Sequence, residues 1–311
     1  MKEISEYFNL WIPSPLQKLN NSGNRNIFVK RDDLIHSVIS GNKFRKLKYI
    51  LLEFYKENKK NIIAFGGAYS NLLHALSLIV RELQIPATFY IRGDGFDDGN
   101  PTLNFIRNND VEMVFLSRSD FKKIRDTDFL KRLKNERPDS YIIPEGASNL
   151  LATYGSAEIY DEIVSDLNRV PDYIIMDMGT GGTFAGVLSK LDNKTKLIGI
   201  PVLKGVNWSK TINEIFNGND FLYNKKNYTI NENYHFGGFG KFNNELIAFI
   251  NNFKFRFGID LDPLYSGKLA FAVQDLILNG YLSDNSDIVW VHGGGLQGIK
   301  GFNRLNNDII Y

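Results

Sequence analysis

Short apolar runs alternate with stretches of helical periodicity along almost the whole chain, and this alternation restricts its fold more than any other feature. Several runs are continuously apolar, which is typical of strands buried on both faces of a parallel sheet. Because parallel strands need crossover connections, the pattern predicts an α/β fold with right-handed crossovers. The predicted strands are residues 27–30, 62–65, 87–91, 111–116, 141–144, 173–178, 196–200 and 288–292.

The predicted helices lie between these strands. In the first of them, Phe44, Leu47, Leu51 and Phe54 fall on one face at helical spacing. Residues 213–232 have the weakest pattern, which predicts a surface excursion. With about 150 residues per domain, a chain of 311 residues suggests two domains, with a boundary near residue 150. The predicted helices are residues 42–57, 71–83, 101–109, 121–134, 150–167, 182–191, 243–255 and 267–278.

The composition excludes several classes of protein. The chain has no cysteine, which excludes disulfides, thiolate nucleophiles and iron–sulfur clusters. Its net charge of +2 gives no electrostatic case for nucleic acid or membrane as a partner. The four histidines lack the spacing of metal ligands, so no metal site is predicted. No signal-peptide pattern begins the sequence and no run approaches the ~20 apolar residues of a membrane span, so we expect a cytoplasmic protein.

The segment Ser-Gly-Asn-Lys-Phe-Arg-Lys-Leu at residues 40–47 directly precedes the amphipathic helix. Ser40 or Asn42 can cap that helix, which places Lys43 in its first turn. A cation there opposes the helix dipole, so the dipole lowers its pKa and favours the neutral amine that Schiff-base chemistry requires. In the alternative interpretation, Lys43 and its basic neighbours form only a solvated helix face.

Two glycine-rich segments each link an apolar strand to a helix. Residues 65–71 place Ser70 or Asn71 at a helix start, which suits an anion such as a carboxylate. Residues 178–186 place three glycines and two threonines, all within residues 179–183, at a helix N-terminus, which predicts a cup for phosphate. Because neither the P-loop nor the dinucleotide spacing is present, a monophosphate is favoured. Tight turns without a ligand remain the alternative for both segments.

Two further segments, residues 262–268 and 291–295, follow predicted strands, where open α/β sheets bind ligands. Taken alone, both segments are weak signals, because a residue such as Tyr265 is more often a core aromatic and one such as His292 a packed strand end. Together with a lysine and a phosphate cup, however, glycine-rich strand ends are what pyridoxal phosphate needs.

At these motifs the chain resembles the D-cysteine desulfhydrase / 1-aminocyclopropane-1-carboxylate deaminase family of fold type II pyridoxal-phosphate enzymes, which is related to the tryptophan synthase β subunit. Residues 30–33 (Lys-Arg-Asp-Asp) with residues 40–47 look like the family's RDD…GNKxRKL signature. Residues 66–71 are similar to its G-x-x-QSN segment, and residues 143–149 and 261–268 match further blocks. The resemblance covers about residues 13–295.

The resemblance implies two open, twisted, mostly parallel sheets flanked by helices. A large cofactor-binding domain would comprise residues 1–38 and 150–311. A small domain, residues 39–149, would carry Lys43 and the loop that binds the substrate carboxylate. A small amino acid would be the substrate and a homodimer the assembly.

The resemblance also implies roles for individual residues. Pyridoxal 5'-phosphate would be held as an imine on Lys43, and Asn71 would bond its ring hydroxyl. Ser266 would lie near the pyridine nitrogen and leave the ring unprotonated, which makes it a weaker electron sink. Tyr265 and Ser70 would act with Lys43 in catalysis. The phosphate would be bound by Gly179, Thr180, Gly181, Gly182 and Thr183, and the substrate by Tyr69, Ser70, Asn71, Phe239 and Gly293.

Four positions depart from the family pattern and bear on the reaction. Ser266 stands where the deaminases carry glutamate, Phe239 replaces a tyrosine, Tyr69 replaces a glutamine, and Gly293 matches neither group. These departures favour a lyase that performs D-cysteine desulfhydrase-like β-elimination, giving a 2-oxo acid and ammonia, over a hydrolytic 1-aminocyclopropane-1-carboxylate deaminase. A pyridoxal-phosphate-binding protein of low activity, or a binding module that uses the cup for another phosphate, remains an alternative. Lys43 distinguishes these alternatives, because aldimine chemistry requires a lysine in the GNKxRKL segment whereas a protein that only binds phosphate does not.

Overall fold

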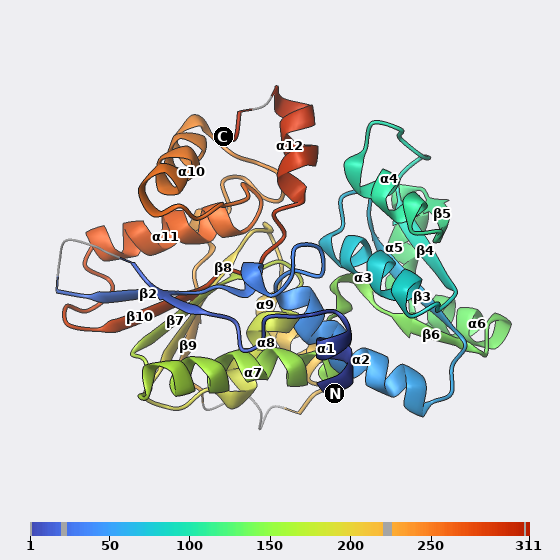
Figure 1. Ribbon diagram of the computed structural model, residues 1–311, viewed down its shortest axis with the longest axis horizontal. Coiled ribbons are helices and arrows are strands. Elements are labelled where there is room, and N and C mark those ends of the chain that lie inside the picture. The colour runs from blue at the N-terminus through green and yellow to red at the C-terminus, as the bar shows by residue number, and fades with distance from the viewer. Residues whose placement is uncertain (1, 20–23, 220–225, 308) are drawn as a thin grey trace.

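The computed structural model describes residues 2–19, 24–219, 226–307 and 309–311, and it contains two β-sheets (Figure 1). The larger sheet has six strands in the order β1-β2-β10-β7-β8-β9, and all of its pairings are parallel except β1 with β2. The smaller sheet has four parallel strands in the order β5-β4-β3-β6. The strands are β1 (Leu16–Lys18), β2 (Asn26–Lys30), β3 (Asn61–Gly67), β4 (Ala87–Arg92), β5 (Glu112–Leu116), β6 (Ser140–Ile143), β7 (Tyr173–Met178), β8 (Lys196–Pro201), β9 (Tyr228–Ile230) and β10 (Asp287–Val291).

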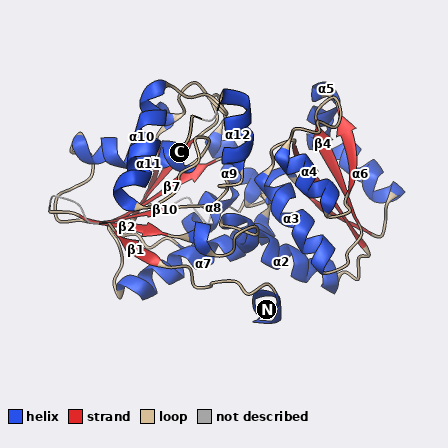
Figure 2. Ribbon diagram, turned by 45° about the horizontal axis from the view of Figure 1, so that its top comes forward, coloured by secondary structure: helices blue, strands red, loops and turns tan. Residues whose placement is uncertain are grey.

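Helices cover both faces of each sheet, so the predicted α/β class with two mostly parallel sheets is confirmed (Figure 2). Along β10, Ile288 and Trp290 pack in one core, while Val289 and Val291 pack in the other. No helix in the described ranges is long and apolar enough to cross a membrane. The helices are α1 (Lys2–Tyr7), α2 (Asn42–Lys56), α3 (Asn71–Glu82), α4 (Pro101–Asn108), α5 (Arg118–Lys122), α6 (Thr127–Glu136), α7 (Leu150–Leu167), α8 (Gly182–Lys190), α9 (Trp208–Ile215), α10 (Asn244–Phe257), α11 (Ser266–Leu278) and α12 (Gly298–Asn306).

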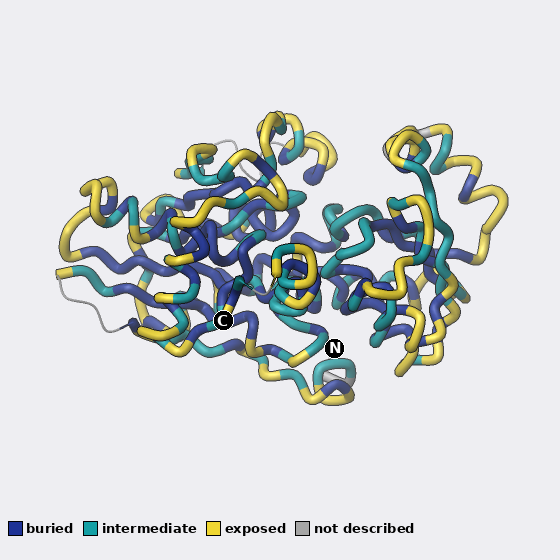
Figure 3. The backbone as a smooth tube through the Cα atoms, turned by 90° about the horizontal axis from the view of Figure 1, so that it is seen from above, coloured by how far each residue is buried: buried dark blue, intermediate teal, exposed yellow. Residues whose placement is uncertain are grey.

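Each of the eight predicted strands is present within a few residues. The buried backbone lies inside the molecule and the exposed segments lie around its outside (Figure 3). The prediction of one helix over residues 121–134 is wrong. Asp126 has an extended backbone and accepts a hydrogen bond from the Asp128 amide, so it caps a new helix, α6, after α5 has ended. Residues 213–232 are also more ordered than predicted, since β9 extends the large sheet; residues 220–225 lie outside the described ranges.

The start of α2 differs from the prediction that Ser40 or Asn42 caps it. Gly41 is the cap, with a positive φ of 66° that favours glycine, and no side chain caps the helix. The amide of Asn42 instead donates to the carbonyl of Gly293, at 3.2 Å. A Cβ atom on Gly41 would lie 1.8 Å from that carbonyl oxygen, so the loop after β10 fixes the first turn of α2.

Helix α2 packs on both sides. Leu47, Leu51 and Phe54 are buried in the core that α2 shares with β3 and α3. On its other side, α2 meets α7 so closely that a Cβ atom on Gly155 would lie 1.9 Å from the carbonyl oxygen of Arg45. The helix therefore joins the small sheet to the helical layer of the large one.

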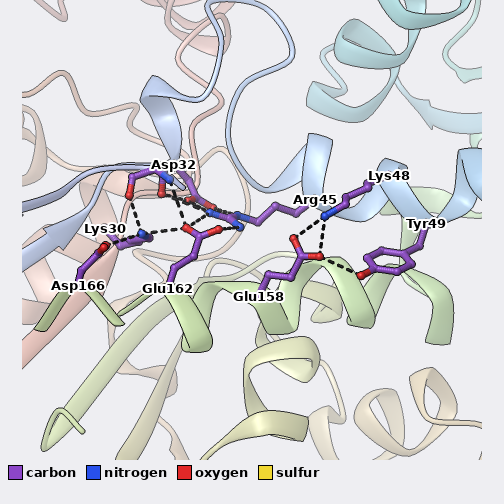
Figure 4. Close-up of polar contacts among 9 residues, drawn as sticks. Lys30, Asp32, Arg45, Lys48, Tyr49, Glu158, Glu162 and Asp166 are labelled. Atoms are coloured by element: carbon purple, nitrogen blue, oxygen red, sulfur yellow. Dashed lines mark hydrogen bonds and ion pairs between the residues drawn. The ribbon is translucent and has the colours of Figure 1, made fainter. Parts of the chain in front are cut away.

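A buried network of ion pairs secures the contact between α2 and α7 (Figure 4). The guanidinium of Arg45 donates to both oxygens of Asp32 at 2.7 Å and to both oxygens of Glu162 at 2.8 and 2.9 Å. Arg45 and Asp32 are fully buried. The ammonium of Lys30 also lies 2.9 Å from Glu162 and 3.0 Å from Asp166. Asp32 of the RDD signature and Arg45 of the GNKxRKL signature therefore have a structural role.

We predict that Arg45→Met destabilises the protein by about 3–5 kcal/mol, because it removes the cation that pairs with the fully buried Asp32 and leaves Glu162 with Lys30 alone. Lys48→Met is the matched control on the same helix, because Lys48 pairs with the half-buried Glu158 of α7. The control should cost about 1 kcal/mol or less. Urea unfolding of both variants measures the difference, and equal losses would contradict the assigned role of Arg45.

Candidate active site

The loops that follow three strands meet the first turn of α2 around a cavity of about 570 Å³. These loops follow β3, β7 and β10, and each begins at the carboxyl end of a parallel strand. This is the edge at which open α/β sheets bind ligands. The volume is in the usual range for a small-molecule site.

Lys43 lines this cavity from the first turn of α2, and its ammonium donates to the side-chain oxygen of Asn42. Burial lowers the pKa of Lys43 to about 8, although the carboxylates Asp177 and Asp262 act in the opposite direction. The predicted direction of the shift is confirmed. Its dominant cause, however, is loss of solvent rather than the helix dipole.

The predicted phosphate cup lies at the N-terminus of α8. Gly181 caps this helix with a φ of 84°, and Gly179, Thr180, Gly181 and Thr183 line the cavity. Gly182, predicted as part of the cup, is absent from the lining of the cavity. A Cβ atom there would lie 2.9 Å from the hydroxyl of Ser148 and 3.0 Å from the amine of Lys46.

Lys46 brings a second amine to the cup. Its Nζ donates to the carbonyl of Gly146 at 3.0 Å, and its side chain is almost fully buried. Burial, with a smaller effect from Lys43, lowers the pKa of Lys46 well below its ordinary value. A buried amine beside a helix N-terminus is suited to a strongly charged anion, because the anion would restore its proton.

The loop after β3 supplies the opposite wall. Ser70 caps α3 by accepting a hydrogen bond from the amide of Leu73 at 3.3 Å, which leaves its hydroxyl proton free for the cavity. The side-chain oxygen of Asn71 accepts from Gln297. Tyr69 lies against α12, where a Cβ atom on Gly301 would come within 2.6 Å of its ring.

Tyr265 and Phe239 lie together at another wall, with an edge-to-face contact of 5.7 Å between ring centroids. Burial, followed by the charges of Asp262, Asp177 and Glu145, raises the pKa of Tyr265, so its phenol keeps its proton and can act as an acid. Phe239 is 46% exposed. Lys268 holds the loop of Phe239 by donating to the carbonyls of His235 and Gly238, both at 2.9 Å.

The structure does not support the expected position of Ser266. This residue is buried and does not line the cavity. Its hydroxyl donates to Asp262 at 2.7 Å and accepts from the Asp262 amide at 2.8 Å. Ser266 therefore belongs to the cap of α11, in which Asp262 also accepts from the amides of Leu264 and Tyr265.

The remaining predicted residues, Gly293 among them, line the cavity, together with polar residues that the sequence did not indicate. Asn42 and Lys46 lie inside a recognised motif, so their spacing could have indicated them. Asp177 ends an apolar strand and carries no signal of its own. Arg92 and Arg118 lie on distant elements.

The fold and the cavity define a class of α/β enzyme that holds a phosphorylated cofactor beside a lysine amine. Residues 8–294 match the family model of the pyridoxal-phosphate dependent enzymes, so the chain belongs to this family. The cavity fits the cofactor, because it places a partly neutral amine near a helix N-terminus that a buried second lysine approaches.

Comparisons with individual proteins agree with this family. A Pyrococcus horikoshii protein, provisionally named 1-aminocyclopropane-1-carboxylate deaminase, is 30% identical over 92% of this chain and 90% of its own length. A bifunctional D-cysteine desulfhydrase/1-aminocyclopropane-1-carboxylate deaminase of Arabidopsis thaliana is 28% identical, covering 93% and 77%. The crystal structure of a homologue of the deaminase aligns over 97% of this chain and 95% of its own, with a TM-score of 0.82 and 26% identity. The resemblance stated from the sequence is confirmed.

We predict that Asp177→Asn stabilises the cofactor-free protein above about pH 6. Burial and the charge of Asp262 raise the pKa of Asp177 from 3.8 to about 6, while Lys43 and His292 act in the opposite direction. Ionisation is therefore disfavoured in the folded state, and wild-type stability falls as the pH rises through this window. Urea unfolding from pH 4 to 8 should show that the free energy of unfolding of the variant rises relative to wild type between about pH 4 and 6. Parallel curves would contradict the shift.

Proposed function

We propose that this enzyme removes the α-proton of a small polar amino acid and eliminates its β-substituent, with D-cysteine-like substrates preferred. The products would be a 2-oxo acid, ammonia and the leaving group. One observation carries the proposal: the amine of Lys43, with its pKa lowered to about 8, lines the same cavity as the helix N-terminus of α8. A neutral amine can take a proton, and the helix terminus can hold an anion.

The residues around the cavity would have separate roles in binding the cofactor, binding the substrate and moving the proton. Pyridoxal phosphate, when bound, supplies the electron sink. Lys43 would hold the cofactor and then take the α-proton at its Nζ. Residues 179–181 and Thr183, with Lys46, would hold the phosphate, and Asn71 the ring hydroxyl. Ser70 caps α3 through its hydroxyl oxygen, and it would donate its hydroxyl proton to the substrate carboxylate.

The preference over 1-aminocyclopropane-1-carboxylate rests on the acid and base groups available. That substrate has no α-hydrogen, so ring opening needs a nucleophile or a proton donor at a ring carbon. Phe239 has no hydroxyl where the family pattern has tyrosine. Tyr265 keeps its proton because burial raises its pKa, so it offers an acid but no base. Elimination needs only Lys43, the sink and a leaving group.

The proposal includes the organisation of the protein. We infer a large domain of residues 1–38 and 150–311 and a small one of residues 39–149, which matches the division into a six-stranded and a four-stranded sheet. We also propose a cytoplasmic homodimer from the family resemblance. Light scattering of the purified protein and fractionation of the source cells test these two statements.

We predict that borohydride reduction of the loaded enzyme fixes the cofactor on Lys43. Lys43→Ala should bind the cofactor only non-covalently and lose turnover. Lys46→Met is the control, because it removes the neighbouring amine and should weaken cofactor binding while fixation at Lys43 persists. In wild type, the binding rate should rise with pH and level off above about pH 8, following the lowered pKa of Lys43. Peptide mapping that finds the label on Lys46 or Lys30 would overturn the assignment.

We predict that pyruvate release from D-cysteine or a related D-amino acid exceeds 2-oxobutyrate release from the cyclopropane substrate, compared as kcat/KM. A panel of D- and L-amino acids, assayed for 2-oxo acid with the purified enzyme, measures this order. Ser70→Ala should raise KM while the cofactor stays bound. The opposite order of substrates would contradict the preference and leave the cofactor assignment intact.

A further inference from the structure

A single carboxylate projects into the cavity from the edge of the large sheet. Asp177 is the penultimate residue of β7, two positions before Gly179, and it lines the cavity. Its Oδ1 lies 3.6 Å from the position that a Cβ atom on Gly293 would occupy. The carboxylate therefore points toward the loop after β10, where the absence of a side chain at Gly293 leaves room in front of it.

This carboxylate caps no helix and forms no ion pair within 4 Å in the described ranges, although the charges of Lys43 and His292 act on it. Within the described ranges, the hydrogen bond found to its side chain comes from its own backbone amide. Its neighbour Asp262 is different, since it accepts four hydrogen bonds at the start of α11. A half-buried carboxylate without such partners costs stability, unless a ligand supplies a donor.

The proposed orientation of the cofactor leaves one polar atom without a partner. Lys43 would form the imine, the cup would bind the phosphate and Asn71 would form a hydrogen bond with the ring hydroxyl. The pyridine nitrogen remains, and in the ring it lies directly opposite the carbon that bears the imine. The hydroxyl of Ser266 is bonded to Asp262, and Ser266 does not line the cavity.

We propose that Asp177 binds the pyridine nitrogen of pyridoxal phosphate and keeps it protonated. The inference rests on the proposed position of the cofactor. A carboxylate facing a pyridinium N–H forms a charge-assisted hydrogen bond, which is stronger than one to a hydroxyl. The ring is then a stronger electron sink than the one that the sequence predicted for a hydroxyl partner. Lys43 therefore removes the α-proton against a smaller barrier.

The test compares three holoenzymes loaded with cofactor labelled with ¹⁵N at the ring nitrogen. In wild type at pH 8, the ¹⁵N resonance should have the shift of a pyridinium. In Asp177→Asn it should move to the shift of a neutral pyridine. Ser266→Ala is the matched control, since it removes the hydroxyl first expected at this atom, and its resonance should stay at the wild-type position.

Cofactor affinity gives a second measurement. Asp177→Asn should bind pyridoxal phosphate about 10- to 100-fold more weakly than wild type, the range expected for one charge-assisted hydrogen bond. Affinity for the carbon analogue that lacks the ring nitrogen should not fall. A pyridinium shift that persists in Asp177→Asn, or that is lost in Ser266→Ala, would overturn the inference while the cofactor site stands. A wild-type protein that binds no cofactor would overturn the proposed function itself.

Discussion

The guanidinium of Arg45, fully buried with Asp32 and also paired with the partly exposed Glu162, determines how the rest of the molecule is arranged. Asp32 follows β2 and Glu162 lies on α7, so a single side chain ties the start of α2 to the sheet and to a helix that covers it. Successive residues of a helix are rotated by about 100°. Lys43, two residues earlier, therefore projects to the opposite side, into the cavity. The rigid network sets the direction of the reactive amine.

The cavity that results is electrostatically incomplete on its own. Burial lowers the pKa values of Lys43 and Lys46 and raises that of Asp177, so each of these groups is shifted toward its neutral form. A phosphate and a cationic ring would reverse those shifts, because they bring the missing opposite charges. Loading the enzyme should therefore be accompanied by uptake and release of protons, and calorimetry in buffers of different ionisation enthalpy would detect both.

Local signals allowed most of the architecture to be predicted, whereas long-range contacts account for the errors. Continuous apolar strands and glycines before helices depend on neighbours in the sequence, so eight strands and the cup at Gly179 were found. The hydrogen bond from Ser266 to Asp262 was not predicted, because the family motif does not reveal this pairing. Asp177 was missed because a lone carboxylate at the end of an apolar strand belongs to no motif that would indicate a site. Helix α2 needs no side-chain cap at Gly41, because the carbonyl of Gly293 accepts a hydrogen bond from the amide of Asn42 in its first turn.

Gly155 illustrates how the packing of α2 complicates the search for active-site residues. It lies in α7 and does not line the cavity, yet it touches the carbonyl of Arg45, two residues from Lys43. Any larger residue there must push α2 away from α7 and carry the reactive amine with it. A mutational scan scored on activity alone would rank Gly155 beside the catalytic residues. Only a parallel measurement of protein abundance would separate the two groups, because displacement of a packed helix lowers both quantities.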